Sequence, residues 1–167
     1  IHSDNTSYNA LITMLGNGDG IKGLQVVNTY MMQLGLQNTQ LHHSLSPGDI
    51  YFSDNGSNMS CPSDIGLLFD LLYQGKIISK VACDQMLNLL KQCSDQRAIW
   101  QGLPNTVEFA HKSGWAYDLY LDGGIVYIPD KDYILVLFTD QISNKTDFFK
   151  EISSLFYTYE TNLFTLE

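Results

Sequence analysis

The chain has 167 residues, of which 44% are hydrophobic and 16% are charged, a composition typical of folded globular proteins. Its formal net charge of -9 argues against a general nucleic-acid partner, because phosphate binding needs clustered lysine and arginine and the nine such residues are spread along the chain. The apolar stretches 65–72 and 134–138 are far shorter than the roughly 20 residues that span a bilayer, so we expect no transmembrane helix.

Up to about residue 92, apolar residues recur at helical spacing in segments bounded by capping and stop residues. The expected helices run from Asp4 or Asn5 to Gly16, from 21 to 34, from 63 to 74 and from 79 to 92. Residues 36–61, between the second and third helices, are rich in Asn, Ser, Gly and Pro and show no period. A stretch of this length without secondary structure usually has a functional role in a compact domain, so we interpret it as the wall of a site.

After residue 104 the hydrophobic period changes from 3.6 to 2, which predicts strands. The expected strands are 107–111, 124–128 and 133–139, joined by turns at 122–124 and 129–132. A closing amphipathic helix is expected at 145–162, with Phe148, Ile152, Leu155, Phe156 and Tyr159 facing the sheet. The pattern predicts an α+β fold with two parts, a helical lobe at 1–104 and an antiparallel sheet with its C-terminal helix at 105–167.

Three strands and one covering helix make an incomplete sheet, because both faces and the edges of a sheet need protection. We therefore expect that this chain does not fold alone as a complete unit, and that a further segment docks against the sheet.

The thiols and the adjacent histidines show no ligand spacing. Cys61, Cys83 and Cys93 have no Cys-x-x-Cys arrangement, and three cysteines cannot all pair within one chain, so we predict buried free thiols. His42 and His43 lack the spacing of zinc ligands. We expect no metal site and no cofactor.

Three short motifs occur in a fixed order. They are Ser3-Asp4-Asn5 at the start of the first helix, Pro47-Gly48-Asp49 in the long loop, and His111-Lys112-Ser113-Gly114-Trp115 on the first strand. In types, order and separation the chain resembles the serine β-lactamases and the penicillin-binding transpeptidases and carboxypeptidases. The resemblance covers nearly the whole chain and implies their fold, with residues 36–61 as an omega-like loop.

The resemblance also implies roles for the helical motif and the loop. Ser3 would relay a proton to the leaving nitrogen of the substrate, and Asn5 would hydrogen-bond the amide of the substrate's side chain. Asp4 would be structural, capping the helix and bracing the loop, and Asp49 would also be structural, near the site.

For the strand motif the resemblance implies direct contact with the substrate. Lys112 would keep the cleft positive and hold Ser3 in place. Ser113 and the adjoining Gly114 would bind the substrate, with Ser113 holding its carboxylate, and the N–H of Trp115 would supply half of the oxyanion hole. His111 is expected to pack or hydrogen-bond beside the strand rather than act as a base.

The family's nucleophile, the serine of a Ser-x-x-Lys motif, has no counterpart here, because none of the eight lysines has a serine three residues before it. Ile1 is not an initiator methionine, and the resemblance places the nucleophile, further strands and a helix in a preceding segment. We expect that segment to be the partner of this chain, which alone would be inactive. An extracytoplasmic location is implied in the same way.

Residues 38–43, before Pro47, contain no carboxylate, whereas class A β-lactamases carry there the Glu that activates the deacylating water. This difference argues against rapid β-lactam hydrolysis and favours a penicillin-binding duty on β-lactams or D-alanyl peptides. Two alternatives remain open. One is a non-catalytic domain of the same fold that binds cell-wall peptide or a protein. The other is an unrelated α+β interaction domain, in which Ser3-Asp4-Asn5 is only a helix cap.

Overall fold

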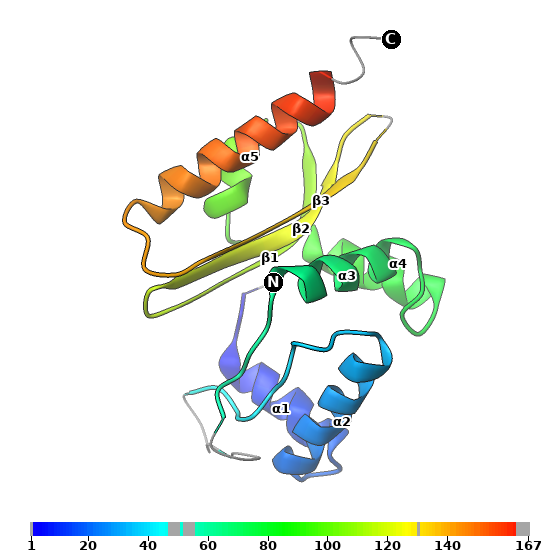
Figure 1. Cartoon of the computed structure of the whole chain (residues 1–167). Helices are drawn as coiled ribbons and strands as arrows, with labels where there is room; N and C mark the ends of the chain where they lie inside the picture. The colour runs from blue at the N-terminus through cyan, green and yellow to red at the C-terminus, as the bar shows by residue number, and fades with distance from the viewer. Residues whose placement is uncertain (1, 47–50, 52–55, 130, 163–167) are drawn as a thin grey trace. The chain divides into compact units, whose positions relative to one another are not determined.

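The computed structural model describes residues 2–46, 51, 56–129 and 131–162. The chain forms two compact units, residues 2–68 and residues 69–167 (Figure 1). No helix in the described ranges is long and apolar enough to cross a membrane. The two lobes predicted from the sequence, 1–104 and 105–167, were divided where the hydrophobic period changes, whereas the two units above are divided by their internal contacts. The predicted lobes therefore stay a prediction.

The unit of residues 2–68 contains helices α1 (Asn5–Leu15) and α2 (Gly20–Gln33) and the first part of α3 (Pro62–Tyr73). Asp19 caps α2 by accepting a hydrogen bond from the backbone N–H of Lys22 at 3.1 Å. The two helices approach closely where α2 has Gly23, because a Cβ there would lie 1.9 Å from the carbonyl oxygen of Ile12. Helix bounds agree with the predicted ones to within two residues.

The segment between α2 and α3 is held by asparagine side chains rather than by regular structure. Asn28 both donates to the carbonyl of Leu41 and accepts from its N–H, each at 2.8 Å. Asn9 does the same for Leu45, at 2.6 and 2.9 Å. Within the described part of 36–61 there are isolated β-bridges but no helix or strand, as the sequence predicts.

The unit of residues 69–167 is built around an antiparallel sheet of order β1-β2-β3. Its elements are the end of α3, α4 (Lys80–Leu90), the 3-10 helix η1 (Ala98–Gly102), β1 (Glu108–Ala116), β2 (Leu119–Tyr127), β3 (Tyr133–Thr139) and α5 (Lys145–Asn162). Helix α5 contacts η1 and β3 along one face of the sheet, and α4 contacts β1 (Figure 1).

The turn between β1 and β2 differs from the predicted one. It lies at Tyr117 and Asp118, where Tyr117 has a φ of 54°, and residues 122–124 are inside β2. The two glycines, whose composition is typical of a turn, lie within the sheet instead. Gly124 pairs with His111, and a Cβ at position 124 would lie 2.6 Å from the Cβ of His111.

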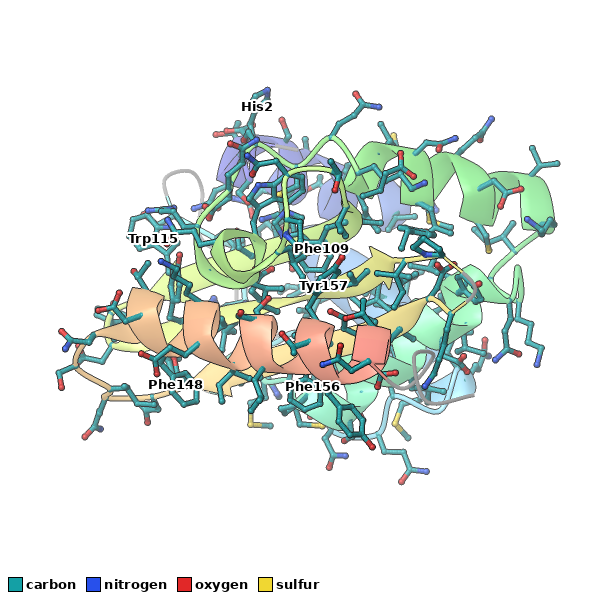
Figure 2. The ribbon with its side chains drawn as sticks, turned by 90° about the horizontal axis from the view of Figure 1, so that it is seen from above. His2, Phe109, Trp115, Phe148, Phe156 and Tyr157 are labelled. Carbon is teal, nitrogen blue, oxygen red and sulfur yellow. The ribbon has the colours of Figure 1, made fainter. Side chains whose placement is uncertain are left out.

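The buried face of α5 also differs from the predicted one. Phe149 and Ser153 are the buried residues, whereas Leu155 and Tyr159 are 63% and 59% exposed. Phe148 and Phe156 are exposed too, and Figure 2 shows them on the opposite side of α5 from Tyr157, which packs on the core. The helix has two apolar stripes. The stripe that contains the small Ser153 is the buried one, because a small side chain lets the helix approach η1 closely.

We predict that Gly23→Ala lowers the free energy of unfolding by about 2 kcal/mol, because the added methyl group meets backbone that cannot move aside cheaply. Gly66→Ala in α3 is the matched control. A Cβ at that position has no atom within 4 Å, so helix propensity alone should make this variant more stable by up to about 1 kcal/mol. Urea denaturation measures both changes, and equal effects of the two variants would contradict the close approach at Gly23.

Candidate functional site

The predicted site residues are divided between the two units. Ser3, Asp4 and Asn5 belong to the unit of residues 2–68, and Lys112 to Trp115 belong to the unit of residues 69–167. Asp49, together with the rest of Pro47-Gly48-Asp49, lies outside the described residues.

In the first unit, Asp4 is the N-cap of α1 and accepts a hydrogen bond from the backbone N–H of Ser7 at 2.7 Å. The hydroxyl of Ser7 also donates to Asp4, and these bonds hold the pKa of Asp4 below its ordinary value. Ser3 is exposed and has a φ of 53°, in the left-handed region. Asn5 donates its side-chain amide to the carbonyl of Ser46. The motif therefore joins the start of α1 to the long loop.

A carboxylate from α3 lies under the loop segment where the β-lactamase glutamate is lacking. Asp64 is 5% exposed and accepts from the N–H of Asn38 at 2.8 Å and from the hydroxyl of Thr39 at 2.9 Å. Burial disfavours its ionisation, but the hydrogen bonds outweigh burial and lower the pKa of Asp64. Its oxygens are engaged in holding the loop, so we assign it a structural role.

In the second unit, Lys112, Ser113, Gly114 and Trp115 lie on β1, which is an edge strand of the described sheet. Lys112 is half-buried and donates from Nζ to the carbonyl of Ser113. A side chain at Gly114 would meet no atom within 4 Å, and Trp115 is 66% exposed. An edge strand leaves backbone N–H and C=O groups available to a ligand.

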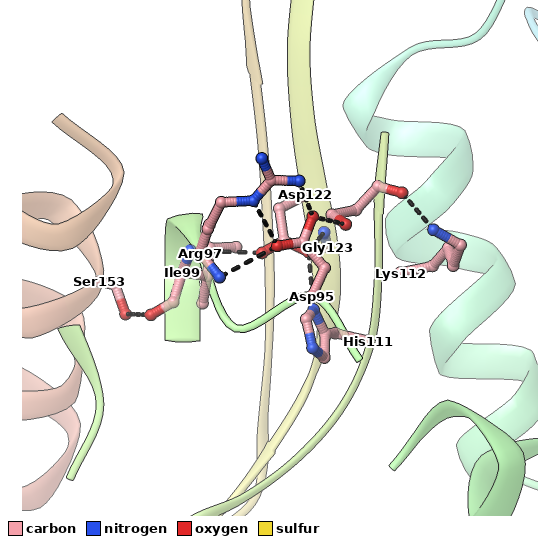
Figure 3. Close-up of polar contacts among 9 residues, drawn as sticks. Asp95, Arg97, Ile99, His111, Lys112, Asp122, Gly123 and Ser153 are labelled. Carbon is pink, nitrogen blue, oxygen red and sulfur yellow. Dashed lines mark hydrogen bonds and ion pairs between the residues drawn. The ribbon is translucent and has the colours of Figure 1, made fainter. Parts of the chain in front are cut away.

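Two residues missed by the sequence analysis adjoin Ser113. Asp95 accepts a hydrogen bond from the hydroxyl of Ser113 at 2.6 Å, and Arg97 pairs with Asp95 through Nε at 2.8 Å and through Nη2 at 3.0 Å (Figure 3). The guanidinium of Arg97 holds the pKa of Asp95 well below its usual range. Arg97 also lies 6.0 Å from the ring of Trp115. No motif marks this pair in the sequence, and only the fold brings it to β1.

Behind the strand, His111 is fully buried and pairs with the fully buried Asp122, with 2.9 Å between Nδ1 and Oδ1 (Figure 3). The ring of His111 stacks on Phe109 with 4.3 Å between centroids. Burial disfavours the imidazolium form. The hydrogen bond and the charge of Asp122, together with Cys93, outweigh burial and raise the pKa of His111 to about 9. The prediction that His111 packs and hydrogen-bonds beside the strand agrees with this geometry.

Within the described ranges, no three histidine, cysteine, aspartate or glutamate side chains are grouped so as to hold an ion. The groups on and beside β1 are a lysine, a hydroxyl, an arginine paired with a carboxylate, and edge-strand backbone. Such a set can hold a carboxylate and stabilise a developing oxyanion.

Comparison with known families agrees with this chemistry. The family model described as the beta-lactamase enzyme family matches residues 1–160. The chain belongs to the β-lactamase enzyme family. No curated protein sequence matches it significantly.

Several solved structures share the fold. A structure of PBP-A is 24% identical with a TM-score of 0.79, and the alignment covers 96% of this chain and 57% of PBP-A. A PBP-A mutant, solved as its acyl-enzyme complex with penicillin G, is 23% identical with a TM-score of 0.76, covering 96% and 58%. A β-lactamase from Francisella tularensis is 20% identical with a TM-score of 0.79, covering 96% and 62%. This β-lactamase family chain therefore spans about three fifths of the length of these structures.

We predict that His111 is still an imidazolium at pH 7.5, observable by NMR titration of its ring. Asp122→Asn should lower the pKa of His111, because the negative charge that opposes the effect of burial is removed. The charged pair stabilises the fold fully below pH 6.5, and its contribution is lost as the pH rises through about 9. Asp118→Asn, in the exposed β1–β2 turn, is the control and should leave the titration unchanged. An unchanged titration in Asp122→Asn would refute the role of Asp122.

Proposed function

We propose that this chain is the C-terminal part of a penicillin-binding serine hydrolase that forms an acyl-serine intermediate with β-lactams or D-alanyl peptides. The observation that carries the proposal is the Lys112-Ser113-Gly114-Trp115 motif on an edge strand, beside Asp95 and Arg97, in a chain matched by the β-lactamase family model over residues 1–160. The penicillin G acyl-enzyme of the similar PBP-A mutant supports β-lactams as ligands.

In the proposed reaction the residues of β1 act on the substrate's charges. Lys112 supplies the positive charge that attracts the substrate carboxylate, and Ser113 donates a hydrogen bond to that carboxylate. The backbone N–H of Trp115 donates to the oxygen of the scissile carbonyl as it becomes an oxyanion. The exposed Trp115 and the open space at Gly114 are consistent with access for a ligand from outside.

The residues at the start of α1 act on the leaving group and on the amide of the substrate. Ser3 passes a proton to the leaving nitrogen, and Asn5 hydrogen-bonds the amide of the substrate's side chain. Asp4, as the N-cap of α1, holds the first turn of the helix at which these residues lie.

The nucleophile, in this proposal, comes from a preceding segment of the same protein, which also completes the sheet. Two features support such a segment. The exposed stripe of Phe148, Leu155, Phe156 and Tyr159 on α5 is unusually apolar for a helix surface, and β3 is an edge strand of the described sheet. About two fifths of the length of the similar structures has no counterpart in this chain. We place the protein outside the cytoplasm, where cell-wall peptides lie.

The composition of residues 38–43 predicts that deacylation is the slow step. Without a carboxylate free to activate water, the acyl-enzyme is expected to persist rather than turn over rapidly. A long-lived acyl-enzyme is the property of a penicillin-binding protein, and it is what makes labelling by a fluorescent penicillin a suitable assay.

We predict that a fluorescent penicillin labels a protein that includes the preceding segment but not this chain alone. Lys112→Ala should slow the labelling on the order of a hundredfold, as for loss of a transition-state electrostatic partner. Lys80→Ala is the control, because Lys80 is an exposed surface residue paired with Asp84. Labelling that is absent from the longer protein would favour the non-catalytic binding domain, and labelling unchanged in Lys112→Ala would refute the assignment of Lys112.

A second prediction concerns Asp95. Its carboxylate accepts the hydrogen bond from the hydroxyl of Ser113, and its negative charge would repel a substrate carboxylate. Asp95→Asn should speed labelling by roughly fivefold, which corresponds to about 1 kcal/mol, because Ser113 and Arg97 become available to the substrate. Ser113→Ala should remove much of this gain, and the double variant measures the coupling. Slower labelling in Asp95→Asn would instead indicate that Asp95 positions Ser113 productively.

A further inference from the structure

The hydrogen bond between Ser113 and Asp95 has a fixed direction. Arg97 holds the carboxylate of Asp95 through Nε at 2.8 Å, through Nη2 at 3.0 Å and through its backbone N–H at 3.1 Å (Figure 3). These charge-assisted bonds keep the carboxylate ionised, and an ionised carboxylate can only accept hydrogen bonds. The hydroxyl of Ser113, which lies 2.6 Å from Oδ2 of Asp95, is therefore the donor.

This direction determines what Ser113 can offer to a ligand. A serine hydroxyl has one proton and two acceptor lone pairs. Because the proton is directed to Asp95, the lone pairs are what remains for a ligand. An ionised carboxylate has no proton to donate to them, and it could accept from Ser113 only after the bond to Asp95 is broken. A neutral N–H group can donate to Ser113 without that exchange.

The charge of Asp95 acts in the same direction as the hydrogen bond. The side chain of Asp95 is 15% exposed, so water screens its charge less than that of a surface carboxylate. A ligand carboxylate at the hydroxyl of Ser113 would lie beside that of Asp95, and like charges at such a short distance repel. A neutral group avoids this repulsion.

A primary carboxamide matches the groups at this position of β1. Its N–H2 group can donate to the oxygen of Ser113, and its carbonyl oxygen can accept from the ammonium of Lys112. That ammonium has three N–H donors and directs one of them to the backbone carbonyl of Ser113. A carboxylate offers acceptors alone, so it satisfies Lys112 but not the lone pairs of Ser113.

The hydroxyl of Ser113 is approached from the exposed end of β1. Ser113 itself is 6% exposed, whereas Trp115, which projects from the same face of the strand, is 66% exposed. The side chain of Arg97 is 55% exposed and lies 6.0 Å from the ring of Trp115. A small terminal group that contacts these two side chains lies beside the bond between Ser113 and Asp95.

We propose that Asp95 makes the β1 site prefer substrates that end in a primary carboxamide over substrates that end in a free carboxylate. The inference rests on the proposed acyl-serine function and specifies which substrates react fastest. Asp95 is a specificity-determining residue that acts through Ser113. A carboxylate ligand such as a penicillin still binds through Lys112, but without a hydrogen bond from Ser113 unless Asp95 is displaced.

The test compares two thioesters of the same N-acyl-D-alanine on a protein that includes the preceding segment. The leaving thiol is mercaptoacetate in one and mercaptoacetamide in the other, so only the terminal group differs. Acyl transfer forms a C–O bond to the serine and breaks the C–S bond, and the serine proton leaves with the thiol. The rate of thiol release gives the acylation rate. The carboxamide thioester should react roughly fivefold faster, the worth of one hydrogen bond.

Asp95→Asn should reverse this preference. The neutral side chain neither repels a carboxylate nor holds the proton of Ser113 as strongly, so the ratio of the carboxamide rate to the carboxylate rate should fall roughly tenfold. Ser113→Ala should slow the carboxamide thioester more than the carboxylate thioester. Asp84→Asn is the matched control, because it removes the same charge from an exposed pair with Lys80, and it should leave the ratio unchanged.

Labelling by a fluorescent penicillin, run in parallel, separates this inference from the function on which it rests. If the penicillin labels the wild-type protein and the carboxylate thioester reacts faster than the carboxamide thioester, the preference is refuted and the acyl-serine function stands. A ratio unchanged in a folded Asp95→Asn variant would refute the role of Asp95. If neither the penicillin nor either thioester reacts, both proposals are wrong. The wild-type ratio decides the preference even where a variant does not fold.

Discussion

The unit of residues 69–167 depends on one buried ion pair, between His111 on β1 and Asp122 on β2. The second oxygen of Asp122 accepts from the N–H of Ile99 at 3.2 Å, which ties η1 to the sheet. The carbonyl of Ile99 then accepts from the hydroxyl of Ser153 at 2.7 Å, which ties α5 to η1. Four elements are thus joined through a single carboxylate. Gly124 is part of the same constraint, because a Cβ there would lie 2.2 Å from the carbonyl oxygen of Ala110 and 2.6 Å from the Cβ of His111.

A buried charge is costly unless its hydrogen-bonding groups are satisfied, and here the carboxylate is satisfied, whereas Nε2 of His111 is buried without a hydrogen-bond partner among the described residues. Asp122 accepts from His111, from Ile99 and from the N–H of Gly123 at 2.9 Å, so that both of its oxygens are used. Removing one partner would leave the other charge alone in the core, which typically costs 3–5 kcal/mol. Because neighbouring residues on a strand face opposite sides, fixing His111 inward also fixes the facing of Lys112. The ion pair therefore sets the geometry of the adjoining motif.

Local signals decided which elements the sequence could predict. Helix bounds were predictable because capping and stop residues such as Asp4 and Gly16 act within one turn of the chain. The β1–β2 turn was not predictable. Asp122-Gly123-Gly124 has the composition of a turn, but these residues lie within β2, where Asp122 contacts His111, 11 residues away in the sequence. The prediction of the buried face of α5 was wrong for the same kind of reason. The helix has two apolar stripes, and its packing on η1 determines which of them is buried. Lys112 was predictable from its motif, whereas its neighbours Asp95 and Arg97 are brought close only by folding.

Charge cancellation around β1 explains how a chain with a net charge of -9 could attract an anionic ligand. Asp122 balances His111 within the core, and Asp95 balances Arg97 at the end of the strand. Of the five charged side chains in this group, the ammonium of Lys112 is left without a carboxylate partner among the described residues, and it donates to the carbonyl of Ser113 instead. The local field at the strand motif is then set by one lysine, not by the net charge of the protein. Interactions over longer distances are screened within about 8 Å at physiological salt, so the negative net charge of the chain weakens this attraction little.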